Sequence, residues 1–149
     1  TLKLLHCITE DKHLIDQVLP LVCHHMKPSM LYESHKKTTV SDAAIRRLAT
    51  KVVIQDLVLL STADYYGRKN ILSNIPKYKA GEWLLNRAEK LDVQKSAPKR
   101  LILGKDLLKL GFKQGKKLGD ILNHTYELQL EGKFVTKEDA LNWIKKIYL

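Results

Sequence analysis

The segment GKDLLKLGFKQGKKLGDIL, residues 104–122, combines four glycines with five lysines. At the start of a helix, the first amide N–H groups lack partners within the helix and lie at the positive end of its dipole. Gly115, followed by Lys116 and Lys117, predicts such a start, with uncovered backbone and added positive charge. This arrangement is typical of phosphate binding. The alternative is that Gly115 and Gly119 allow two helices to pack closely.

Positive charge is concentrated around this segment. The chain has a formal net charge of +10, and between residues 95 and 117 eight basic residues stand against one acidic residue, Asp106. Such a surplus favours a polyanionic partner, because phosphates that bind lysine or arginine release counterions. A solubilising charged face is the alternative explanation. The residues that we expect to contact phosphate groups are Lys99, Arg100, Lys105, Lys109, Lys113, Gly115, Lys116, Lys117 and Gly119.

Two histidines and an aspartate form a second candidate site. His24 and His25 are adjacent in CHHM, and Asp64 follows in TADYYGR. A metal-dependent hydrolase of this kind needs an adjacent His-Asp pair to hold the ion that activates water. The sequence contains no such pair. We therefore predict no metal site and keep these three residues only as weak candidates.

The spacing of apolar residues predicts an all-α fold, a helical bundle followed by a small helical tail. Asp11 is expected to cap a helix that closes at Pro28, and the polar stretch Met30 to Thr39 is expected to be a loop. Ser41 begins one long helix or two abutting helices. Further helices are expected over residues 82–91 and 105–110, from Gly115 to Gly132, and after Thr136. Residues 70–81 and 92–99 are expected to be connectors.

Local signals fix some of these boundaries. Gly111 stands where a left-handed helix C-cap needs glycine. Thr136 and Asp139 have the spacing of a capping box, with Ile147 among the residues facing the core.

The two cysteines, Cys7 and Cys23, lack metal-ligand spacing and are expected to be buried, reduced thiols. Since no apolar run reaches the roughly 18 to 20 residues that cross a bilayer, we expect a cytoplasmic protein without a membrane partner.

Five segments in order carry a resemblance to a known family. SDAAIRRLATKV, LVLLSTADYYGR, GEWLLNRAEKLDV, APKRLILGKDLLKLGFKQGKKLGDIL and YELQLEGKFVTKEDALNWI together resemble the C-terminal half of bacterial tRNA nucleotidyltransferases, the CCA-adding enzymes and their poly(A) polymerase relatives. The resemblance covers nearly the whole chain. It divides the chain into a bundle, 1–92, similar to the later part of an HD-like or body domain, and a tail, 93–149, that would bind RNA. Relatives commonly carry proline where this chain has Gln114.

The resemblance implies that the body and tail hold tRNA, while an N-terminal head transfers nucleotides from CTP and ATP with Mg²⁺. The head's signature, a glycine-rich turn followed by two aspartates one residue apart, is absent here. We therefore expect a fragment that binds tRNA, adjoins a head upstream of Thr1, contains no cofactor and is not catalytic alone. The choice between CCA, partial CCA and poly(A) addition would reside in the head.

Two alternatives of other classes remain open. Some family members also carry a helical metal-dependent phosphohydrolase domain, and the chain is alternatively a part or remnant of such an HD-type domain, with His24, His25 and Asp64 as its weak metal candidates. The other alternative is a protein-interaction or dimerisation module with an exposed apolar patch.

Overall fold

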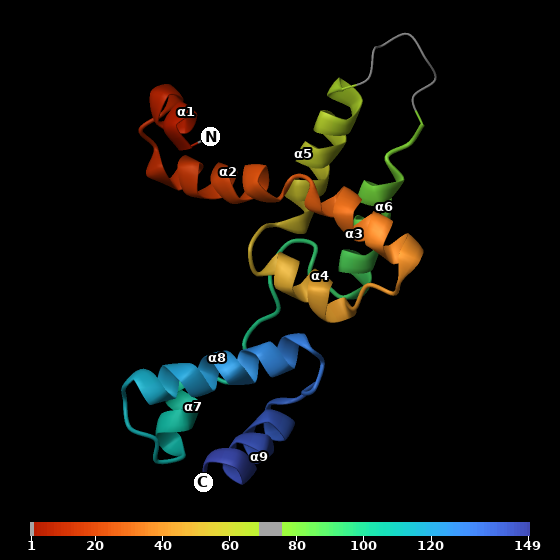
Figure 1. Cartoon of the computed structure of the whole chain (residues 1–149). Helices are drawn as coiled ribbons and strands as arrows, with labels where there is room; N and C mark the ends of the chain where they lie inside the picture. Colours follow the sequence, from red (N-terminus) through yellow and green to blue (C-terminus); the bar gives the residue numbers. More distant parts are fainter. Residues whose placement is uncertain (1, 69–75) are drawn as a thin grey trace. The chain divides into compact units, whose positions relative to one another are not determined.

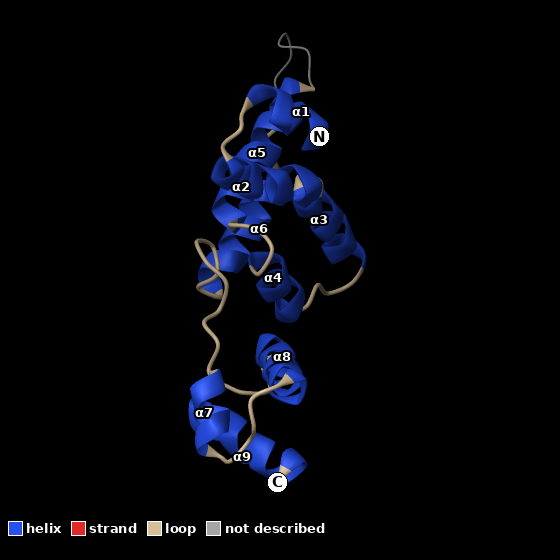
Figure 2. Cartoon of the chain, turned by 90° about the vertical axis from the view of Figure 1, so that its left-hand side faces the viewer, coloured by secondary structure: helices blue, strands red, loops and turns tan. Residues whose placement is uncertain are grey.

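The structure is a computed structural model that describes residues 2–68 and 76–149. It contains two compact units, Thr1–Ala97 and Pro98–Leu149, here called unit 1 and unit 2. The boundary follows Ala97, whereas the family resemblance placed it after residue 92. The described residues form helices and connecting segments without any strand (Figure 2), which confirms the predicted all-α fold. Half of the connector expected over residues 70–81 lies outside the described residues, and its last three residues belong to a helix that begins at Lys79.

Unit 1 is built from helices α1 to α6 (Figure 1). Their bounds are Leu2–Ile8 for α1, Lys12–His24 for α2, Lys27–Lys37 for α3, Asp42–Ala49 for α4, Ile54–Gly67 for α5 and Lys79–Lys90 for α6. Asp11 caps α2 as predicted, because its Oδ1 accepts the N–H groups of His13 and Leu14 at 2.9 and 3.2 Å. Ser41 caps α4 in the same way, through the N–H of Ala44. The stretch that Ser41 opens is therefore two helices, with a break after α4.

The core of unit 1 lies between α4, α5 and α6. Its buried residues, here called the first core, are Val40, Ile45, Leu48, Ala49, Val52, Ile54, Leu57, Leu84, Ala88 and Val93. Five of them have no exposed surface: Ile45, Ile54, Leu57, Leu84 and Ala88. Removal of this apolar surface from water is the main stabilising contribution to the unit.

The polar stretch expected as a loop is largely helix α3, so that prediction is wrong. The preceding prediction, that Pro28 closes a helix, is also wrong, because Pro28 stands in the first turn of α3, where proline's missing N–H costs nothing. Packing then holds α3 against α6: the rings of Tyr32 and His35 lie 5.9 and 4.9 Å from that of Trp83. A helix stabilised by a few aromatic contacts leaves a weak apolar pattern in the sequence.

Unit 2 contains α7 (Gly104–Lys109), α8 (Lys116–Leu130) and α9 (Lys137–Tyr148). Its main hydrophobic cluster, here called the second core, consists of the buried residues Ile102, Leu107, Ile121, Phe134, Ala140 and Ile144. The capping box is present as predicted: Thr136 Oγ1 accepts the N–H of Asp139, and the Asp139 carboxylate accepts the N–H of Thr136. Ile147 was expected in the core but is 54% exposed, because it lies on the outer side of the last turn of α9.

Two other expectations concern exposure to solvent. Cys7 and Cys23 are free thiols, and both are exposed, so the prediction of buried cysteines is wrong. Their apolar sequence neighbours belong to α1 and α2, whose outer faces carry these side chains. Among the helices of the described residues, none combines the length and the apolar character that a membrane crossing requires.

Candidate functional site

The start of α8 is the feature on which the phosphate-binding prediction depends. Gly115 is its N-cap, with φ +152° and ψ −174°, and no side chain caps the first turn. Gly115, Lys116 and Lys117, here called the α8 start, are all exposed. The helix therefore presents its positive end and two ammonium groups to solvent, which is the electrostatic arrangement that favours an anion.

The turn that leads into α8 is set by Gly111. Its φ of +93° places it in the left-handed region. The N–H of Gly111 donates to the carbonyl oxygen of Leu108, and the N–H of Phe112 donates to that of Leu107, which is the Schellman pattern. Gly111 is thus the left-handed C-cap that the sequence predicted. This turn brings the exposed Lys113 into the same connection as the α8 start.

Close packing does not explain the other two glycines. A Cβ atom added at Gly115 or Gly119 would meet no other atom within 4 Å, so neither glycine makes room for a neighbouring helix. The N–H of Gly119 already donates to the carbonyl oxygen of Gly115 at 3.4 Å. Gly119 therefore offers open space beside the helix but no free amide, and the uncovered amides lie at the α8 start.

The carboxylate of Asp106, the one acidic residue of the basic run, is bonded to Lys137, which lies outside the run. Its side chain is only 8% exposed; Oδ1 accepts a hydrogen bond from Lys137 Nζ at 2.7 Å and Oδ2 accepts one from the N–H of Leu103 at 3.0 Å. These two bonds, that with Lys137 first, hold the pKa of the Asp106 carboxyl below its usual value. The carboxylate is thus bonded to Lys137 on α9, and its attraction to Lys105 on α7 is the smallest of the contributions to this pKa.

Lys99 and Arg100 lie along the side of α8. The guanidinium of Arg100 stands 4.4 Å from the ring centre of Tyr126 and donates to Asn123 Oδ1 at 3.2 Å. The carbonyl oxygen of Lys99 accepts a hydrogen bond from Gln129 Nε2 at 2.8 Å. Both side chains remain exposed. Arg100 is therefore positioned by contacts within unit 2, and its charge still faces solvent.

The candidate phosphate-binding residues all belong to unit 2 and fall into two groups along α8. Asn123, which holds Arg100, is seven residues after Lys116, so about 10 Å of helix rise separates the two positions. Lys113, Lys116 and Lys117 cluster at the beginning of the helix, and Lys105 and Lys109 lie on α7, which packs beside α8 (Figure 1). Every one of these lysines is exposed. Their spread suits contacts with successive phosphates better than the enclosure of one small molecule.

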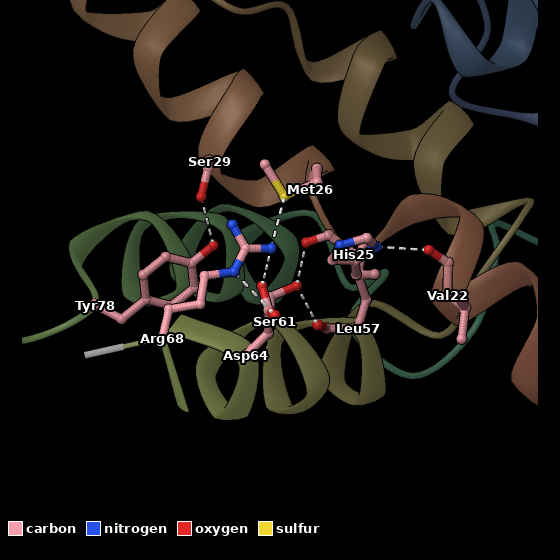
Figure 3. Close-up of polar contacts among 9 residues, drawn as sticks. All are labelled: Val22, His25, Met26, Ser29, Leu57, Ser61, Asp64, Arg68 and Tyr78. Carbon is pink, nitrogen blue, oxygen red and sulfur yellow. Dashed lines mark hydrogen bonds and ion pairs between the residues drawn. The ribbon is translucent and has the colours of Figure 1, made fainter. Parts of the chain in front are cut away.

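The weak metal candidates are not brought together as ligands. The Nδ1 of His25 donates to the carbonyl oxygen of Val22 at 2.6 Å, and Asp64 forms an ion pair with Arg68 at 2.7 Å. Figure 3 draws both interactions. Within residues 2–68 and 76–149, no group of three histidine, cysteine or carboxylate side chains could hold a metal ion. His24, His25 and Asp64 are therefore not part of a cluster of three such ligands within these ranges.

The polar contacts around these residues connect helices. Ser61 on α5 is buried, and its Oγ lies within hydrogen-bonding distance of the carbonyl oxygens of Leu57, 2.7 Å, and His25, 2.6 Å (Figure 3). Ser29 on α3 bonds to the hydroxyl of Tyr78 at 2.8 Å. These hydrogen bonds join the end of α2 to α5 and the beginning of α3 to the start of α6. We therefore assign these groups a structural role.

Two hollows in unit 1 were not found by sequence reasoning. A groove of about 690 Å³ lies between α2 and α5, and its apolar lining includes Leu59, which is 72% exposed. A smaller pocket of about 190 Å³ is formed by the end of α2, the start of α3 and α4. Lys27 and Lys51, which line it, lie outside the basic run and carry no local motif. Only the fold brings them together.

The chain was compared with protein-family models, curated proteins and solved structures. None of the three comparisons finds a match.

Proposed function

We propose that this chain is the tRNA-binding C-terminal region of a tRNA nucleotidyltransferase that acts in the cytoplasm. The proposal combines the family resemblance of the sequence with the surface of unit 2. The observation that carries it is the α8 start, exposed and without a side-chain cap, beside Lys113 in the preceding turn. In the intact enzyme, a head upstream of Thr1 would use Mg²⁺ with CTP and ATP to extend the tRNA, and the chain described here would hold the substrate.

The chemistry of this surface suits the backbone of a folded RNA. The amides and the ammonium groups of Lys116 and Lys117 would contact phosphate oxygens, and such contacts fix the position of an RNA without reading its sequence. Lys99 and Arg100, farther along α8, would contact phosphates beyond the helix start. Selection of tRNA would then depend on its folded outline, since double-helical RNA is recognised mainly by shape and by its backbone.

The test is the binding of tRNA to the whole chain, measured by fluorescence anisotropy. The double variant Lys116→Glu with Lys117→Glu is expected to weaken binding about tenfold or more, because it replaces two attractive contacts by repulsive ones. The matched control is Lys145→Glu with Lys146→Glu, an exposed pair of adjacent lysines in the last turn of α9. These lysines stand at the negative end of a helix, where no phosphate is expected. Equal losses in both variants, or none in either, would overturn the proposal.

A further inference from the structure

The smaller pocket of unit 1 is lined by basic side chains from three helical segments. His24 ends α2, Lys27 begins α3, and Arg47 and Lys51 lie at the end of α4 and just after it. Among the described residues that line the pocket, none is acidic. We call these four residues the basic pocket. Its members belong to unit 1, whereas the candidate phosphate-binding residues between Lys99 and Gly119 belong to unit 2.

Two of the four residues of the basic pocket carry a charge that no acidic side chain in the described part of the chain pairs with. Lys27 and Lys51 have no ion-pair partner among the described residues. Partial burial lowers the pKa of the His24 imidazole, and the nearby charges of Lys51 and Lys27 lower it further. The two lysines therefore disfavour protonation of the His24 imidazole. The same field would repel a metal ion, which is the opposite of what the hydrolase interpretation requires.

We propose that the basic pocket binds a phosphate group. Its volume of about 190 Å³ corresponds to roughly six water molecules, enough for one tetrahedral anion and part of its ester. Leu31 and Leu48 give the pocket an apolar floor, which lowers the local dielectric constant and strengthens the attraction between lysine and phosphate. The phosphate would be that of a small ester or a backbone phosphate of RNA. This proposal does not rest on the proposed function, because a small phosphate ester would present the same group to the pocket as RNA does.

His24 provides a direct readout of occupancy. A bound anion favours the imidazolium form, so the pKa of His24 should rise when the pocket is filled. The measurement is an NMR pH titration of the histidine side chains of the whole chain, with and without sulfate, a tetrahedral anion whose charge is constant over this range. His13, exposed on α2, reports the general effect of salt. The proposal predicts a saturable rise at His24 that His13 lacks. A rise of the same size at both residues would overturn it.

Variants then test the lysines at fixed pH with inorganic phosphate. Lys27→Gln and Lys51→Gln should each weaken phosphate binding about fivefold, while Lys51→Arg should retain most of it, since it keeps the charge. Lys37→Gln, at the exposed end of α3, is the matched control and should have no effect. Unchanged affinity in both Gln variants, with circular dichroism showing intact helices, would contradict the proposal.

Two further titrations identify the source of the phosphate. If a mononucleotide shifts the His24 signal at the concentration at which inorganic phosphate does, the site takes a small ester; if an RNA oligonucleotide acts at a much lower concentration, it takes a backbone phosphate. Both results support the pocket. The Lys116→Glu with Lys117→Glu variant keeps the two proposals apart, because it should abolish neither the His24 shift nor its saturation.

Discussion

The two units carry the same excess of positive charge on very different amounts of protein. Each has five more basic than acidic residues, but unit 1 has 97 residues and unit 2 has 52. The first core contains ten buried residues and the second core six. In unit 1 four basic groups are gathered in a pocket, whereas in unit 2 the lysines lie on exposed helix ends and turns. A pocket suits one anionic group and an open surface suits a polymer, so similar charge can serve different ligands.

The largest expected effect comes from the smaller core. Ile144→Ala should destabilise unit 2 by about 2–5 kcal/mol, because the fully buried side chain leaves a cavity among few neighbours. Each unit contains one tryptophan, Trp83 in unit 1 and Trp143 in unit 2. Urea unfolding of single-tryptophan variants follows each unit separately. The Trp143 transition should shift much more than that of Trp83, and equal shifts would show that the units unfold as one.

The next effect concerns the ion pair between α7 and α9. Asp106→Asn should cost unit 2 about 1–2 kcal/mol at neutral pH, because it weakens two hydrogen bonds to a charged, little-exposed group. Thermal unfolding at several pH values is the measurement, with the exposed Asp120→Asn as control.

The sign of the pH dependence follows from the lowered pKa of Asp106. Between its folded value and the unfolded value of about 3.9, the unfolded chain binds more protons, so stability rises with pH in that range. The contribution is complete above about pH 5 and is lost as pH falls through the folded pKa. The Asp106→Asn chain should lack this part of the acid sensitivity, and an unchanged acid profile would contradict the pairing.

The smallest effect separates the glycines of unit 2. Gly119→Ala should stabilise the chain by about 0.5–1 kcal/mol, because alanine favours a helix interior and its Cβ meets no neighbour. Gly115→Ala should destabilise it by about 1 kcal/mol or more, since φ is +152° there. Thermal unfolding of the two variants checks this difference. If Gly115→Ala stabilised the chain, residue 115 would not require the positive φ that favours glycine.

Signals between near neighbours in the sequence predicted several helix ends, although the one read at Pro28 was wrong. Asp11, Ser41 and Thr136 were identified as caps, and Gly111 as the left-handed residue after α7, because each depends on groups within a few positions. Contacts between distant residues were missed. The helix α3 depends on rings packed against Trp83, and the burial of Asp106 depends on Lys137, 31 residues later.

The two candidate sites also differ in whether their residues are near neighbours in the sequence. The α8 start was predicted because its glycine and lysines are adjacent in sequence, and the structure leaves them exposed. The basic pocket was not predicted, since Lys27 and Lys51 meet only when α4 folds back towards the end of α2. His24 was noticed for its type, as a metal candidate, and its cationic neighbours change that interpretation.

The most direct test of RNA binding at the α8 start is the salt dependence of tRNA affinity. Each lysine that contacts a phosphate contributes about one unit to the slope of log K against log salt concentration. Lys116→Gln with Lys117→Gln should therefore reduce the slope by about two, while Lys145→Gln with Lys146→Gln on α9 should leave it unchanged. An unchanged slope in the first variant, or an equal reduction in the second, would contradict a phosphate site at the start of α8.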